Sequence, residues 1–177
     1  MQLLTNALIQ AGIRPRDMPS EWFDIPNSID YKNALEVSLP LIKASWLTDR
    51  EQWEDAYRQL CDIYSHKEDL IALCLTETKW ELIFSALCTG RKDEAMQLLD
   101  KELMDYIEKY RKVMSSKDRI LCAVELFINK DYNVAYQIYT NLEQRKDSYL
   151  LRGEVASDLA IMKKLLDSFS HLKSSVS

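Results

Sequence analysis

The amino-acid sequence predicts an all-α fold. The chain of 177 residues contains 3 glycines and 4 prolines, whereas an average protein carries roughly 7% Gly and about 5% Pro. No proline occurs after Pro40, so nothing of that kind interrupts a helix in the rest of the chain. An all-β sandwich or barrel would need many tight turns, which normally take Gly or Asn. Three isolated glycines also exclude the glycine-rich phosphate loops of nucleotide-binding folds.

The N-terminal part, residues 1–30, is expected to differ from the rest. Apolar residues at helical spacing predict a first short helix over residues 2–11. A proline-rich lead-in follows, because each proline disfavours helix at the residue before it. Trp22 and Phe23 lie in this lead-in. They either pack as a lid across the next helices or form an exposed docking arm.

Capping residues and breaks in the apolar spacing place seven further helices in order. Ser28 is a possible cap for the first, in which Pro40 should produce a kink or a break. Thr48 and Glu51 have the spacing of a capping box, which predicts that the second helix starts there. Gly90 is the residue best suited to end the third. The expected ranges are 28–47, 48–65, 68–89, 92–114, 117–128, 132–145 and 148–172.

Three segments repeat one helical pattern. They align on Ala56, Ala95 and Ala135, which are 39 and 40 residues apart, and a large residue follows each alanine four positions later. That offset places both side chains on the same helix face. Small or apolar residues also recur 12 and 9 positions before each alanine. Each unit is therefore expected to be two helices joined by a short turn, with a small residue where they cross closely.

This pattern resembles the second half of the tetratricopeptide repeat (TPR), in which a turn precedes an aromatic residue, two spacers, an alanine and a large residue. Residues 131–139 match best and residues 90–99 next, within a resemblance that covers about residues 38–145. The period of about 40 exceeds the usual one of about 34, and Lys92 replaces the aromatic residue in the middle unit.

The resemblance implies a right-handed TPR-like α-solenoid of about three hairpins over residues 31–147. Residues 148–177 would then form a C-terminal capping helix and a frayed tail within one structural unit. Two other interpretations stay open. One is a different right-handed array of helical hairpins, and the other is an irregular bundle in which the repeat is accidental.

The resemblance also implies a concave surface lined by the first helix of each hairpin. Carried over position by position, its lining residues are Glu77, Trp80, Glu81, Phe84, Lys117, Ile120 and Val124. Such a surface is apolar and lacks the clustered Lys, Arg and Asn that clamp an acidic peptide terminus. Three occupants are open: a helix or peptide segment of a partner, the chain's own last helix, or a second copy of the chain.

No residue pattern favours a catalytic or metal site. The two histidines, His66 and His171, lack the spacing that zinc ligands need on helices. The four cysteines include no Cys-x-x-Cys pair and lie among apolar residues, which favours buried free thiols. We therefore expect no metal, no cofactor and no enzyme. Glu77 and Glu81 share a helix face, so an acid–base pair in a helical-bundle enzyme is the outside alternative.

Charge and hydropathy favour a cytoplasmic protein that binds other proteins. The formal net charge of −5 argues against binding nucleic acid through its phosphates. No apolar run approaches the roughly 18 residues of a membrane span, and the first residues lack the pattern of a secretory signal. We expect a non-catalytic module, monomeric or homodimeric, that holds or masks a helix or peptide of a partner. A small acidic inhibitor, an immunity-type protein or a secretion chaperone is the alternative, because acidic charge would suit a basic partner.

Overall fold

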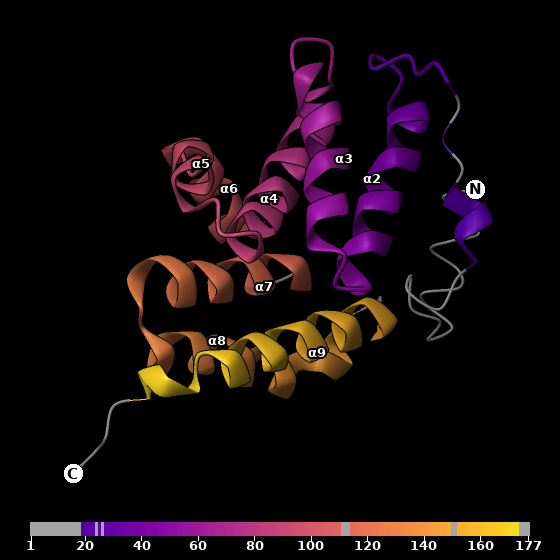
Figure 1. The fold of residues 1–177 in the computed structure, drawn as a ribbon. Coiled ribbons are helices and arrows are strands. Elements are labelled where there is room, and N and C mark those ends of the chain that lie inside the picture. Colours follow the sequence, from indigo (N-terminus) through magenta and orange to yellow (C-terminus); the bar gives the residue numbers. More distant parts are fainter. Residues whose placement is uncertain (1–18, 24, 26, 111–113, 150–151, 174–177) are drawn as a thin grey trace.

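The computed structural model describes residues 19–23, 25, 27–110, 114–149 and 152–173, and it is built from helices (Figure 1). None of the described residues lies in a β-strand. The predicted all-α class is therefore confirmed for this part of the chain. The helix expected over residues 2–11 lies outside the described residues.

Eight α-helices and several short helical turns make up the described ranges. The α-helices are α2 (Ala34–Asp49), α3 (Trp53–Ser65), α4 (Ala72–Cys88), α5 (Lys92–Leu98), α6 (Lys101–Tyr110), α7 (Ser115–Val124), α8 (Tyr132–Arg145) and α9 (Arg152–Ser168). The short elements are the 3-10 turns η2 (Ser20–Phe23), η4 (Lys146–Ser148) and η5 (Ser170–Leu172), and the π-helical η3 (Glu125–Asn129), which continues α7. None of these helices is both long and apolar enough to cross a lipid bilayer.

The predicted helix starts at Ser28 and at Thr48 are wrong. The side chain of Asn33, not that of Ser28, caps α2 by accepting a hydrogen bond from the backbone N–H of Leu35 (3.1 Å). Thr48 is 1% exposed and lies inside α2, which continues through Pro40 to Asp49. The expected capping box therefore does not form. Glu51 instead takes a left-handed backbone conformation (φ 60°) in the turn before α3.

Two later predictions also need correction. The expected helix over 68–89 begins only at Ala72. The expected helix over 92–114 is two helices, α5 and α6, separated at Leu99 and Asp100. The Asp100 carboxylate accepts a hydrogen bond from the backbone N–H of Leu103 (2.7 Å). This side chain satisfies one of the free amides at the start of α6, which stabilises the break.

Consecutive helices pack in pairs, and the repeated alanines lie in these pairs. The helix α2 packs against α3, α4 against α5, and α7 against α8, and the first two pairs also pack on each other through α3 and α4. Ala56, Ala95 and Ala135, on the second helix of each pair, are all 0% exposed. A methyl group lets two helix backbones approach closely, so the buried alanines account for the repeat that the sequence shows.

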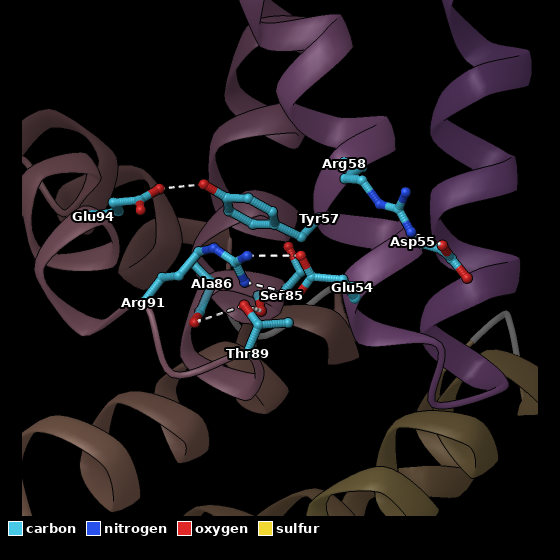
Figure 2. Close-up of polar contacts among 9 residues, drawn as sticks. All are labelled: Glu54, Asp55, Tyr57, Arg58, Ser85, Ala86, Thr89, Arg91 and Glu94. Atoms are coloured by element: carbon cyan, nitrogen blue, oxygen red, sulfur yellow. Dashed lines mark hydrogen bonds and ion pairs between the residues drawn. The ribbon is translucent and has the colours of Figure 1, made fainter.

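Polar side chains join the first two pairs (Figure 2). Arg91 precedes α5 and donates two hydrogen bonds to the carboxylate of Glu54 on α3 (2.9 and 2.7 Å). The Arg91 guanidinium also lies over the ring of Tyr57, 4.2 Å from the ring centre. The Tyr57 hydroxyl in turn donates to the Glu94 carboxylate. These contacts fix α5 against α3.

The first helices of the pairs form a continuous row that α9 extends. Contacts run from α2 to α4, from α4 to α7 and from α7 to α9, and Figure 1 shows α9 lying beside α7 and α8. At its other side α9 reaches α2, where the hydroxyl of Ser157 donates to the carboxylate of Asp49 (2.9 Å). Lys164 on α9 also pairs with Glu51. These two side-chain contacts therefore connect the two ends of the row, α9 with the C-terminal end of α2 and the turn after it.

Candidate binding pocket

A cavity of about 390 Å³ lies between α2, α4, α7 and α9. Each helix presents residues at helical spacing, such as Glu77, Trp80 and Glu81 on α4, because positions three and four apart share a face. The other described lining residues are Ala34, Leu35, Ser38, Leu41, Ile42, Ser45, Asp49, Ile71, Leu73, Cys74, Met114, Ser116, Arg119, Glu154, Ser157 and Asp158.

Large apolar side chains are exposed at one part of this wall. Leu35 is 75% exposed, Leu73 53% and Ile71 42%. Leu35 and Leu73 lie in the first turns of α2 and α4, and Ile71 directly precedes α4. We call these three residues the apolar rim. Single exposed leucines are common on proteins, but several beside one cavity mark a surface suited to an apolar partner.

An ion-pair network joins α4, α7 and α9 at the pocket wall. Arg119 on α7 is 3% exposed and donates to the carboxylates of Glu81 (2.5 Å) and Asp158 (3.0 Å). The Ser115 hydroxyl donates to the second oxygen of Asp158 (2.5 Å). Burial lowers the pKa of Arg119, but Glu81 and Asp158 raise the same pKa by a larger amount, so the guanidinium stays charged. We call these four residues the Arg119 network.

Carboxylates outnumber cations in the pocket wall. Its acidic residues, here called the acidic set, are Asp49, Glu77, Glu81, Glu154 and Asp158. Within the described part of the wall, Arg119 is the one cation. It is already engaged by Glu81 and Asp158, so the wall keeps an excess of acidic groups.

Burial changes the protonation of several members of the acidic set. Burial, with the nearby charge of Asp158, raises the pKa of Glu154 to about 8. Burial also raises the pKa of Asp158 to about 6, against the opposing effect of Arg119. The pKa of Glu77 is raised by burial and by Glu81, and Lys117 partly offsets the rise. At neutral pH the empty pocket therefore holds Glu154 largely in its protonated form.

Lys117 lies behind the wall, not in it. Its side chain is fully buried, and its ammonium lies over the ring of Trp80. The Lys117 ammonium makes no hydrogen bond to any described residue. Burial lowers the pKa of this lysine to about 7, with Glu81 and Glu77 acting in the opposite direction. The lysine is thus a weak cation that supports Trp80 from the interior.

The structure brings together part of the site that the sequence predicts. Glu77, Trp80 and Glu81 line the pocket, as expected. Phe84, Ile120 and Val124 instead belong to the buried core around α4 and α7. These helices pack directly on each other, so the residues one turn beyond Glu81 face the neighbouring helix and not the cavity.

Several pocket residues of α2, α7 and α9 lie outside the set that the sequence predicts. Asp49, Arg119, Glu154 and Asp158 were not among the expected lining residues, although Arg119 follows Lys117 by only two positions. A signal was available in the polar residues Glu154, Ser157 and Asp158, which share one face of the last helix.

The last helix was one of the three expected occupants of the concave surface, and it covers part of that surface, because Ile161 packs in the same core as Phe84, Ile120 and Val124. Its apolar residues Val155, Met162 and Leu166 pack in the core with α8. Its polar face, with Glu154 and Asp158, forms one wall of the cavity. The helix therefore borders the pocket and leaves its volume open.

The four cysteines and His66 lie in surroundings that suit a structural role. Cys61, Cys74, Cys88 and Cys122 are all free, and burial raises the pKa of Cys88 and Cys122 to about 12, so these thiols stay protonated. The His66 ring stacks on Tyr31, with ring centres 3.7 Å apart. No group of three His, Cys, Asp or Glu side chains in the described ranges is placed to hold a metal ion.

No protein-family model matches this chain, and comparisons with curated proteins and with solved structures find no match. The helix pairs and their buried alanines are compatible with a helical repeat. Function is therefore inferred from the pocket and its residues.

Proposed function

We propose that this protein is a non-catalytic interaction module of TPR-like helical hairpins whose pocket holds a helix or peptide segment of a partner protein. The observation that carries the proposal is the cavity of about 390 Å³ with the apolar rim at its wall. Its volume falls in the range of roughly 300–1,000 Å³ that is usual for small-molecule sites, so it has room for side chains of the bound segment. An amphipathic helix would place its apolar face against the rim and its anchor residues in the cavity.

The arrangement of the helices supports the TPR-like part of the proposal. The pocket is lined by α2, α4 and α7, the first helices of the three pairs. In the TPR-like solenoid that the sequence resembles, those helices line the concave surface. The inserted helix α6 between α5 and α7 is a departure from a simple hairpin repeat.

A blocking substitution tests the proposal. Ser38 lines the cavity on α2, and Ser38→Trp would fill much of the space with an indole ring. The native host's lysate is passed over immobilised wild-type protein and over this variant, and the retained proteins are identified by mass spectrometry. We expect one partner to be retained by the wild type and lost with the variant.

The matched control places the same side chain outside the pocket. Met96 on α5 is 51% exposed and is not among the lining residues, so Met96→Trp should retain the partner. Circular dichroism shows whether both variants are folded. Equal retention of every partner by a folded Ser38→Trp variant would contradict the proposal. The partner's nature also separates a general module from the inhibitor, immunity-type and secretion-chaperone alternatives.

An acid–base enzyme is a second candidate, favoured by the raised pKa values of Glu77 and Glu154 in one pocket. Glu81 is paired with Arg119, so Glu154, which lines the same pocket as Glu77, replaces it as the second carboxyl of this candidate. The two candidates differ in the effect of Glu77→Gln on a panel of ester and glycoside substrates. Turnover that this variant abolishes would favour the enzyme, whereas a binding module shows no Glu77-dependent turnover.

A further inference from the structure

We propose that the pocket recognises a basic side chain, Lys or Arg, of the bound segment, and that Glu77 and Glu154 are the carboxylates that receive it. This inference rests on the proposed function, because it specifies the chemistry of the segment that the pocket holds. Three observations carry it: the charge of the wall, the unused hydrogen-bonding capacity of these two carboxylates, and the apolar surface around them.

The charge of the wall favours a cation over an anion. The acidic set has five members, and the one cation in the described wall, Arg119, already pairs with two of them. Lys117 lies behind Trp80 and has a pKa lowered to about 7, so it offers little to an acidic ligand. A cationic group would complete the charge balance, because buried charges are stabilised when they are paired.

The carboxylates of Glu77 and Glu154 can accept further hydrogen bonds. Each is partly buried and lines the cavity. The influences on their pKa values are burial and neighbouring charges, with no hydrogen bond to a described residue. Other acidic residues of the wall are engaged: Asp49 by Ser157, and Glu81 and Asp158 by Arg119. A carboxylate can accept several hydrogen bonds, so these two are the ones that can accept them from a bound ligand.

The groups around Glu154 come from all four helices of the pocket. They are Asp49 on α2, Glu81 on α4, Arg119 on α7 and Asp158 on α9. Lys117 on α7 also interacts with Glu154. Three of these five groups are acidic, so the surroundings disfavour a further unpaired negative charge on Glu154. An ammonium or guanidinium group that arrives there stabilises the ionised form, and Glu154 would release its proton on binding.

The apolar lining suits the rest of such a side chain. Lys and Arg carry aliphatic stems that pack along apolar surface while their charged ends reach polar groups. Leu41, Ile42 and Trp80 line the cavity beside the carboxylates. The apolar rim is left for the flanking residues of the segment. The expected ligand is thus a helix with a basic residue in the middle of its apolar face.

A displayed library of random 16-residue peptides tests the inference on the full chain. Peptides selected on the wild type are screened against Ser38→Trp, and those that lose binding are kept as pocket-dependent. We expect these peptides to share a Lys or Arg flanked by apolar residues. Replacing that residue by norleucine, which keeps the stem and removes the charge, should weaken binding at least about tenfold.

Variants of the protein test the two carboxylates directly. The double variant Glu77→Gln with Glu154→Gln should bind the basic peptide at least about tenfold more weakly and the norleucine peptide equally well. Glu102→Gln, an equal change of charge on the exposed face of α6, is the matched control and should change neither affinity. Circular dichroism confirms that the variants are folded.

Calorimetry measures the proton release on binding, which a merely structural role of Glu154 would not change. In buffers of different ionisation enthalpy at pH 7, binding of the basic peptide to the wild type should release a proton from Glu154. Binding to Glu154→Gln should release less. Equal proton release in the two proteins would overturn the assignment of Glu154.

The outcomes separate this inference from the proposed function. Pocket-dependent peptides that lack a basic residue, or that tolerate norleucine in its place, would overturn the inference and leave the binding function standing. A library that yields no pocket-dependent peptide would overturn both.

Discussion

Arg119 compensates the negative charges of two carboxylates in the pocket wall. Its guanidinium meets Glu81 from α4 and Asp158 from α9, and both the guanidinium and Asp158 are only 3% exposed. A buried ion pair adds little compared with a well-packed apolar alternative, but loss of one partner leaves an uncompensated charge. The network therefore fixes how three helices meet, and its loss should be costly.

Removal of the Arg119 charge should destabilise the protein strongly. We expect Arg119→Met to lower the free energy of unfolding by about 3–5 kcal/mol, because two buried carboxylates lose their cation. Denaturant titration at pH 7 measures the change. A triple variant that adds Glu81→Gln and Asp158→Asn should recover much of the loss. A single variant within about 1 kcal/mol of the wild type would show that the pairs are solvated, as surface pairs are.

Protonation of Glu154 should make stability depend on pH. Its pKa of about 8 in the folded chain exceeds the ordinary 4.5, so the folded state binds this proton more tightly than the unfolded state. The contribution of Glu154 to the free energy of unfolding therefore falls as pH rises from about 4.5 to about 8. Glu154→Gln, which does not titrate, should gain stability relative to the wild type across that window.

Melting temperatures of the two proteins at several pH values check this expectation. Asp158 also has a raised pKa and interacts with Glu154, so the difference between the two proteins reports Glu154 together with its coupling to Asp158. The difference should be small near pH 4.5 and should level off above pH 8. A difference that stays constant between pH 5 and pH 8 would contradict the raised pKa.

Helix pairs depend on the small residues where two helices cross. Ala135 on α8 is fully buried, whereas Ala156 on α9 is exposed. Ala and Leu have similar helix propensity, so a substitution at either position tests packing. Ala135→Leu should cost about 1–3 kcal/mol through overpacking, and Ala156→Leu should cost little. Denaturant titration of both variants compares them, and equal stability would mean that the alanine spacing does not mark close crossings.

The helices were predictable from local patterns, and several of their ends were not. Absence of proline after Pro40 and the spacing of apolar residues suffice for the helical class. Thr48 and Glu51 have the spacing of a capping box, yet α2 continues to Asp49, whose carboxylate accepts a hydrogen bond from Ser157, 108 residues away. Local sequence carries no information about such a distant partner. Asp100 is a different case, because its partner, the backbone N–H of Leu103, is only three residues away. There the continuous apolar pattern hid a local start of α6.

The pocket belongs to the whole molecule, and this explains why only part of it could be predicted. Glu77, Trp80 and Glu81 follow from one helix face in a repeat. Arg119 and Asp158 become pocket residues only when α7, α9 and α4 meet. Prediction from a repeat assigns equivalent positions to every unit, so it placed Ile120 and Val124 in the groove, although the crossing of α4 and α7 buries them.

Removal of the last helix should expose the core of the third pair. Deletion of residues 148–177 uncovers the faces of α7 and α8 on which Val155, Met162 and Leu166 pack, and it removes one pocket wall. We expect the shortened chain to be less stable and to self-associate, since an exposed apolar face favours association. Analytical ultracentrifugation with thermal melting measures both. A monomeric shortened chain of unchanged stability would contradict this role of α9.

The hydrogen bond between Asp49 and Ser157, 108 residues apart, has a consequence for synthesis on the ribosome. The helix pairs form between neighbours in sequence, so they can fold as the chain emerges. The contact of α2 with α9 has to wait until nearly all of the described chain has left the exit tunnel, since synthesis proceeds from the N-terminus at about 5–20 residues per second. During those seconds the acidic residues of α2 and α4 and the apolar rim are open to water. Competence to bind a segment in the completed pocket is therefore acquired late, when α9 docks.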